Sequence, residues 1–496
     1  MTSEATAVRR KPARSGSMSL LSVELLIVIA VFVGVYGIVG TAPAQLTIES
    51  LYRLSWLNNA VLVVQIIVLR KSFGSLTAPV VLYAVFLSLF TSGQLILFSI
   101  GVEPSGADVL NREAAYSVAR ATAFYLTAFT LFCAGCLLTN EVKRNKPARE
   151  GPTPTPDDWQ RSLLSVGGVC LVVGLVPFLV SNYHNFRVVL TEGYSGYYAE
   201  GARLESPLLS LSYLFITGLV FVGCAGRPRA RDAAAGTLVA IALMRLAAGD
   251  SGEGMIYLLS GYLLRTQFAR SDSGKRIMLV LIFAFALLAI PAVGLMRQSF
   301  GGGTGDLGTA LQQDNPLETT LGTIGGTLFP LVSVVELVPA AVPYAAGATY
   351  LSSVTRLMPE ILHAGPLADI AADPLYSSPA TWLMNYRGMS YGPGFTPFAE
   401  AYLNFGWWAG CLALLLYGVL TALLLRLPNK ASTAWPFRTA LVLATFALLG
   451  FTVRGSFNLV VPFLFWYVFL PGVPVVLFAH RFRRKREGVS KVRNAH

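Results

Sequence analysis

The chain has 496 residues, of which 54% are hydrophobic and 13% are charged, and its formal net charge is +12. Soluble domains carry roughly 25% charged residues, so this composition excludes a chain built mainly of soluble domains. The basic residues cluster between apolar segments and at both termini, where they set membrane orientation, and this placement argues against nucleic-acid binding. We therefore predict an all-α, polytopic integral membrane protein.

Twelve apolar segments are each close to the roughly 20 residues that a helix needs to cross a bilayer. From the N-terminal end, they lie near residues 20–40, 51–70, 76–100, 116–139, 162–181, 207–225, 232–249, 253–268, 277–296, 406–426, 435–453 and 457–479. The first segment is too long for the core of a signal peptide and lacks a cleavage site, so we expect it to remain as a span.

The predicted organisation follows from these spans and from the positions of lysine and arginine. It comprises a cytoplasmic basic N-terminus (1–19), nine spans (20–296), a large periplasmic loop (297–405), three spans (406–479) and a cytoplasmic basic tail (480–496). All eight lysines then lie on the cytoplasmic side. The cations expected outside are all arginines, namely Arg53, Arg112, Arg120, Arg187, Arg203, Arg245, Arg297, Arg356, Arg387 and Arg454.

An outer surface with arginine and no lysine favours recognition of anions, because the planar guanidinium group matches the oxygens of phosphate and carboxylate. Arginine also outnumbers lysine by thirty to eight in the whole chain, so part of this asymmetry reflects composition. Two outer loops are long. The first (182–206) is rich in tyrosine and holds His184, Arg187, Tyr198 and Arg203.

The second loop (297–405) contains a partly apolar stretch, Leu317–Pro343, which we expect to form helices lying against the membrane surface. Within the predicted spans, Arg245 stands roughly 20 Å along its helix, and Asp250 and Glu253 follow closely enough to pair with it. A charge inside a membrane is a functional candidate, although a structural ion pair between two helices would satisfy the same pattern.

Glu400 lies just before a long apolar span, after Gly394 and Pro397 and among aromatic residues. Such surroundings can prepare a carboxylate to act as a general base, whereas an ordinary helix cap is the alternative. His184 and His363 in the outer loops are other candidates for the base. No cluster with the spacing of metal ligands is visible, so we expect neither metal nor cofactor.

Three motifs resemble those of one known family, the Wzy-type O-antigen polymerases, which join oligosaccharide repeat units. GFTPFAEAYLNFGWWAG (Gly394–Gly410) resembles the start of a late span in that family, and VPYAAGATYLSSVTRLMPEI (Val342–Ile361) resembles part of its large periplasmic loop. FTVRGSF (Phe451–Phe457) resembles an Arg-Gly at the outer end of the penultimate span. Where relatives often show Gly-Ser-Arg, this chain has Gly249–Gly254, and we assign that role to Arg245.

The resemblance implies a GT-C-like polymerase or ligase architecture in the bacterial inner membrane. It also implies periplasmic glycosyl transfer between two undecaprenyl-diphosphate-linked oligosaccharides in the lipid bilayer, with a chain-length regulator as a possible partner. The candidate catalytic residues are Glu400 and His363. The candidate substrate-binding residues are Arg187, Arg203, Arg245, Arg297, Arg387, Arg454, Tyr198 and Tyr402.

Two other functions fit parts of the pattern. An O-antigen ligase would use the same donor with a different acceptor, and would typically depend on a periplasmic histidine such as His363. A flippase for lipid-linked oligosaccharides would usually show two similar halves, which this sequence lacks.

Overall fold

The computed structural model describes most of the chain and leaves several segments out. The described residues are 19–40, 47–102, 109–144, 154–196, 210–248, 250–267, 277–282, 284–285, 289–292, 315–357, 365–389, 392, 394–429 and 432–493. Within these ranges every regular element is a helix, which confirms the prediction of an all-helical protein.

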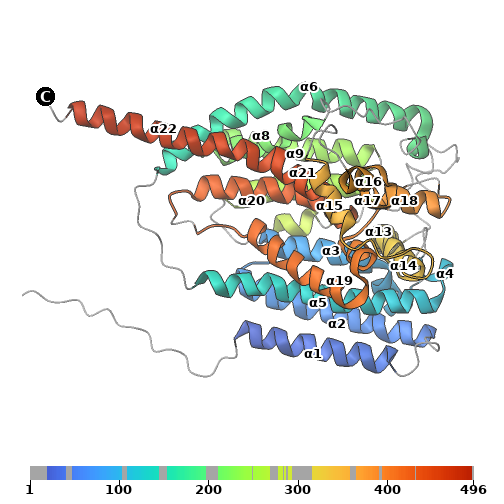
Figure 1. Ribbon diagram of the computed structural model, residues 1–496. Helices are drawn as coiled ribbons and strands as arrows, with labels where there is room; N and C mark the ends of the chain where they lie inside the picture. Colours follow the sequence, from blue (N-terminus) through green and yellow to red (C-terminus); the bar gives the residue numbers. More distant parts are fainter. Residues whose placement is uncertain are drawn as a thin grey trace, which may run out of the picture.

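The long helices lie side by side in one bundle, with the shorter helices gathered toward one end (Figure 1). In chain order, the first half contains α1 (Leu20–Val39), α2 (Ile48–Phe73), α3 (Pro79–Ser99), α4 (Val109–Arg112), α5 (Ala115–Arg144), α6 (Pro156–Gly196), α8 (Ser212–Cys224), α9 (Pro228–Ala247) and α10 (Ser251–Thr266). The second half contains α13 (Pro316–Ile324), η2 (Gly325–Thr327), α14 (Leu328–Leu337), α15 (Ala348–Thr355), α16 (Pro366–Ala372), α17 (Pro374–Ser377), α18 (Pro379–Tyr386), α19 (Pro397–Leu425), α20 (Trp435–Leu449), η4 (Gly450–Arg454), η5 (Phe457–Leu459), α21 (Val460–Leu464), η6 (Phe465–Phe469) and α22 (Leu470–Arg493).

Nine of the described helical stretches are long and apolar enough to cross a bilayer, so the chain is a multi-pass membrane protein. Eight of them coincide with predicted spans. Predicted spans 207–225 and 253–268 correspond to helices of 13 and 16 residues, which are shorter than a bilayer crossing needs. Span 232–249 corresponds to α9, which carries several charges, and span 277–296 is described only in part. The predicted total of twelve is therefore not confirmed.

The ninth long stretch, Pro316–Leu337, comes from the region predicted to lie against the membrane surface as part of the large outer loop. It packs closely against α3, with further contacts to α5 and α19. A Cβ atom at Gly93 would lie 2.5 Å from the Leu321 carbonyl oxygen, so the two backbones touch. Gln94 adds a side-chain hydrogen bond of 3.1 Å to the Gly322 carbonyl. Small residues that permit such close approach are typical of contacts between membrane helices.

The contact between α5 and α19 is of the same kind and is the most extensive in the bundle. A Cβ atom at Gly418 would lie 2.0 Å from the Phe132 carbonyl oxygen, and one at Gly135 would lie 2.0 Å from the Leu415 carbonyl oxygen. Neither position accepts a side chain unless the helices separate. This pair of glycines sets the distance between the two helices that carry much of the candidate site.

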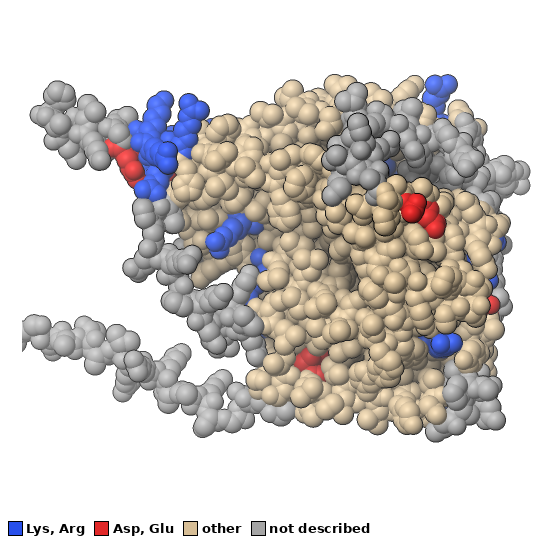
Figure 2. All heavy atoms as spheres, viewed as in Figure 1, with Lys and Arg blue, Asp and Glu red and all other residues tan. Residues whose placement is uncertain are grey.

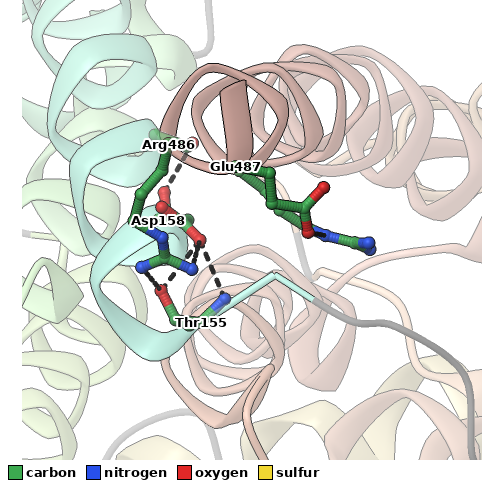
Figure 3. A network of polar contacts seen from close by, with 6 residues as sticks. Thr155, Asp158, Arg486 and Glu487 are labelled. Carbon is green, nitrogen blue, oxygen red and sulfur yellow. Dashed lines mark hydrogen bonds and ion pairs between the residues drawn. The ribbon is translucent and has the colours of Figure 1, made fainter. Parts of the chain in front are cut away.

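The basic tail is fixed to the start of α6 (Figure 3). Asp158 accepts hydrogen bonds from the backbone N–H and the hydroxyl of Thr155, at 2.9 and 2.8 Å. Arg486 of α22 pairs with the same carboxylate at 3.3 Å and donates to the Thr155 hydroxyl at 2.9 Å. Figure 2 shows the basic side chains gathered around this end of α22. The positive-inside rule assigns this C-terminal end of α22 to the cytoplasm.

Replacing Gly418 by alanine tests the α5–α19 contact. The added Cβ atom has no room, so we expect the protein to lose roughly 1–3 kcal/mol of stability through overpacking. Gly37 of α1 is the matched control, because nothing lies within 4 Å of its Cβ position. Gly37→Ala should be neutral or slightly stabilising, since alanine favours helices. Thermal unfolding of the detergent-purified variants gives the midpoint of each. Equal midpoints for Gly418→Ala and Gly37→Ala would contradict the close contact between α5 and α19.

Candidate functional site

The candidate site is built around a break in α19 at Gly406, whose backbone angles are φ 66° and ψ −151°. The break interrupts the hydrogen bonds of the helix, so nearby carbonyl groups need other partners. The backbone N–H groups of Ala345 and Ala346 donate to the carbonyls of Leu403 and Asn404, at 3.0 Å each. Irregular backbone at membrane depth persists only where protein groups replace the missing partners.

Glycine is required at this break for two reasons. Its positive φ is unfavourable for residues with a side chain. In addition, a Cβ atom at Gly406 would lie 2.8 Å from the Tyr344 hydroxyl. The loop that satisfies the free carbonyls therefore also occupies the space beside the break. Further along this loop, the Gly347 N–H donates to the Asn404 side-chain oxygen at 2.9 Å.

Glu400 lies in the short part of α19 before the break, with its side chain fully buried. Its Oε1 accepts a hydrogen bond of 2.7 Å from the Thr349 hydroxyl, and its Oε2 accepts one of 2.5 Å from the Phe457 backbone N–H. The Asn404 amide donates to the Thr349 hydroxyl oxygen at 2.7 Å, which leaves the hydroxyl proton free to point at Glu400. One carboxylate thus joins three segments that are far apart in the sequence.

This geometry bears on the predicted role of Glu400. A general base must lie within hydrogen-bond reach of the proton that it removes. Here both carboxylate oxygens have donors from the protein itself, and the side chain is closed off from solvent. In this conformation Glu400 positions α15 and the start of η5 relative to α19. Its role as a base stays a prediction that requires these hydrogen bonds to open.

Two of the predicted arginines lie at the end of the α9–α10 pair. The Arg245 Nε atom is 3.2 Å from Glu253 Oε2, which confirms the expected pairing. Arg454 passes between two glycines: a Cβ atom at Gly252 would lie 3.8 Å from its Cδ, and one at Gly394 would lie 2.9 Å from its Cγ. Gly252 precedes Glu253 directly, so the two arginines share the N-terminal turn of α10.

The Arg454 segment is also continuous with the Glu400 network. Its carbonyl oxygen accepts a hydrogen bond of 3.1 Å from the Phe395 N–H, just before α19 begins. Three residues later, Phe457 donates to Glu400. The same stretch of backbone therefore carries an arginine at one end and a carboxylate partner at the other.

Arg387 forms a separate cluster. It pairs with Glu336 of α14 at 2.6 Å, lies 4.0 Å from Glu113, and stands 5.9 Å from the centre of the Phe329 ring. Burial raises the pKa of the Glu113 carboxyl, and the charge of Arg387 opposes that rise. With two carboxylates beside it, the guanidinium is occupied within the protein. It ties α18 to α14.

The remaining predicted residues fall into three groups. Tyr402 is buried, and its hydroxyl accepts a hydrogen bond of 3.1 Å from Arg120. Arg187 and His184 lie on the last turns of α6, where Arg187 is exposed. The predicted residues outside the described part of the chain are Tyr198, Arg203, Arg297 and His363. Among the described residues, no group of three His, Cys, Asp or Glu side chains is placed to hold a metal.

A family model for the O-antigen polysaccharide polymerase Wzy matches residues 24–486, nearly the whole chain. The chain belongs to this family. No curated protein and no solved structure matches it. Family membership confirms the resemblance drawn from the three sequence motifs, and all three contribute to the Glu400 network: Thr349 comes from the second, Asn404 from the first and Phe457 from the third.

Several residues of the network could not be chosen from the sequence. Thr349 and Asn404 are common polar residues, and Phe457 takes part through its backbone. Their only sequence signal is that each lies inside one of the three motifs. Arg120 was visible only as one of ten outer arginines, because nothing in the sequence pairs it with Tyr402 across 282 residues.

Replacing Thr349 by valine tests the buried hydrogen bond to Glu400. The change leaves a carboxylate oxygen without its donor in a closed site, so we expect a loss of about 1–3 kcal/mol in stability. Thr349→Ser keeps the hydroxyl and is the control. A lowered unfolding midpoint for valine together with a near-normal one for serine is the expected result. Equal midpoints for valine and the unmodified protein would show that the hydrogen bond contributes nothing.

Proposed function

We propose that the protein polymerises undecaprenyl-diphosphate-linked oligosaccharide repeat units at the periplasmic face of the bacterial inner membrane. In this reaction a hydroxyl oxygen of the acceptor sugar forms a bond to the anomeric carbon of the donor glycan. The bond from that carbon to the lipid diphosphate breaks, and the diphosphate leaves with the bonding electrons. The hydroxyl proton passes to a base. The proposal rests on the family and on the arrangement of fixed cations.

The observation that carries the proposal is that Arg245 and Arg454 both lie at the N-terminal turn of α10, where Glu253 holds the guanidinium of Arg245 in place. A leaving diphosphate gains negative charge, and donors already fixed in place stabilise that charge without reorganising during the reaction. Arginine suits this task, because its fork can bind two phosphate oxygens at once.

The position of the arginines supports a periplasmic site. Arg245 lies in the last turn of α9, a helix whose first turn holds Arg229 and Arg231. Arg454 ends η4, which continues α20 away from the basic loop around Lys430. If the basic ends face the cytoplasm, both arginines lie toward the opposite side of the membrane. Both chain termini would then be cytoplasmic, and the lipid-linked glycan would reach the site from the outer leaflet.

The ligase alternative assigns the same donor chemistry to His363, which lies outside the described residues. The flippase alternative has no support from family membership. A chain-length regulator remains part of the proposal only as a partner that would set how many units are joined.

The ladder of glycan lengths in a strain lacking this protein tests the proposal. We expect products with a single repeat unit, because transport and ligation continue without polymerisation. Loss of all surface glycan would point to a ligase or flippase instead. Complementation with Arg454→Lys keeps the charge but removes the two-pronged contact. This variant should restore far less long-chain glycan than the unmodified protein at equal abundance. Full restoration would show that Arg454 contributes only a positive charge.

Two substitutions separate the possible roles of Glu400. If it is the base, Glu400→Gln should lower polymerisation by at least the roughly 100-fold typical of lost base assistance, whereas Glu400→Asp should retain some activity. If it is a positioning residue, the order reverses. Glutamine keeps the length and still accepts from the Phe457 N–H, whereas aspartate is one carbon short of holding both partners. Polymerisation rates and unfolding midpoints of both variants decide between the two orders.

A further inference from the structure

Arg120 is a half-buried cation for which the described residues supply no carboxylate. It lies five residues into α5, and its guanidinium donates to the Tyr402 hydroxyl at 3.1 Å. A phenol is neutral, so it accepts a hydrogen bond without balancing the charge. A guanidinium has five N–H donors in a fixed plane, and this contact uses one of them. The side chain therefore keeps both charge and donors for another group.

Three other arginines near the same end of the bundle have a carboxylate partner. Arg53 pairs with Glu49 at 2.5 Å, Arg245 with Glu253 at 3.2 Å and Arg387 with Glu336 at 2.6 Å. Placing a cation in a partly buried position without a counter-charge is costly. Arg120 also lies near the N-terminus of α5, where the positive end of the helix dipole adds to its charge. Such an arrangement is favourable once an anion binds.

Among the described residues, the groups that contact Arg120 or its partner Tyr402 hydroxyl are aromatic and polar. Tyr116 and Tyr344 lie close enough to the Tyr402 hydroxyl to interact with it electrostatically, and both are partly exposed. Tyr344 also reaches the break in α19, as the close approach of its hydroxyl to Gly406 shows. The Tyr402 hydroxyl thus contacts the guanidinium directly, and two further phenols lie near that hydroxyl. Each phenol can donate a hydrogen bond to an oxygen of a bound anion.

This cluster adjoins a surface suited to a hydrocarbon chain. Phe124, one turn after Arg120, packs edge-on against both Tyr402 and Trp407, at 5.1 and 5.5 Å between ring centres. Beyond the break, α19 exposes an apolar face on which Trp408 is 70%, Leu412 57% and Leu416 59% accessible. In a membrane helix this face meets lipid.

We propose that Arg120, with Tyr402 and Tyr344, binds a phosphate of the polyprenyl diphosphate carrier while its isoprenoid chain lies along the exposed face of α19. This assignment rests on the proposed function. It adds an entry site on the α5–α19 side, distinct from the Arg245–Arg454 pair at α10. A diphosphate matches the charge and the donors, and the hydrocarbon chain matches the face below them.

Binding of undecaprenyl diphosphate to the purified full-length protein in detergent tests the site, with inorganic pyrophosphate and undecaprenol as separate probes. Arg120→Gln should weaken the binding of undecaprenyl diphosphate about 10- to 100-fold, which is the range for losing a hydrogen bond to a charged group. Arg53→Gln is the matched control, because Arg53 is exposed and already paired with Glu49. Tyr402→Phe, which removes one hydroxyl and keeps the ring, should weaken binding by a smaller factor.

The outcomes distinguish this proposal from the polymerase function. Unchanged affinity of Arg120→Gln for undecaprenyl diphosphate would contradict the site. Pyrophosphate binding as tightly as undecaprenyl diphosphate would also contradict it, because the isoprenoid tail would then contribute nothing to binding. If Arg120→Gln fails to fold, Arg120→Lys replaces it in the test and should still lower the affinity for undecaprenyl diphosphate. A strain lacking the protein could make only single-repeat glycans and regain full polymerisation with Arg120→Gln. That result would support the polymerase function and contradict the Arg120 site.

Discussion

A break inside a membrane helix leaves carbonyl groups without partners, and a bilayer offers none. The break at Gly406 imposes this constraint on the whole candidate site. The loop at Ala345–Gly347 supplies the missing donors, and this brings Thr349 to Glu400 a few residues later. Glu400 in turn holds the backbone of Phe457, which follows Arg454 by three residues. The position of Arg454 is therefore linked to a hydrogen-bond requirement of α19.

Much of the fold could be predicted from the sequence, because apolar length is a direct consequence of bilayer thickness. Eight predicted spans reappear as long apolar helices. The stretch Pro316–Leu337, predicted to form helices against the membrane surface, is helical and packs against α3. In the fold, Gly325 lets this stretch approach α3 closely, because a Cβ atom there would clash with the Gln94 backbone nitrogen. Whether a glycine breaks a helix or permits contact depends on a neighbour that the sequence does not reveal.

The site was predictable only in part, for a similar reason. Arg245 and Glu253 are eight residues apart, so their pairing follows from one turn between two helices. The partners of Glu400 are 51 and 57 residues away, and one of them is a backbone N–H. Arg387 shows what the sequence leaves out: as an outer arginine it was predicted to bind substrate, and in the fold it pairs with Glu336 and lies near Glu113. Charge type can be read from a sequence, whereas charge balance requires the fold.

The helix α22 offers a practical consequence for imaging. It continues as 24 helical residues to Arg493, and the contacts of Arg486 with Asp158 and Thr155 fix its direction relative to α6. A small protein joined through an unbroken helix after Arg493 would inherit that direction, rotating about 100° and advancing about 1.5 Å for each residue inserted. Such a fusion would give a mostly membrane-embedded particle a visible feature outside the detergent micelle, with which projections of single molecules could be aligned.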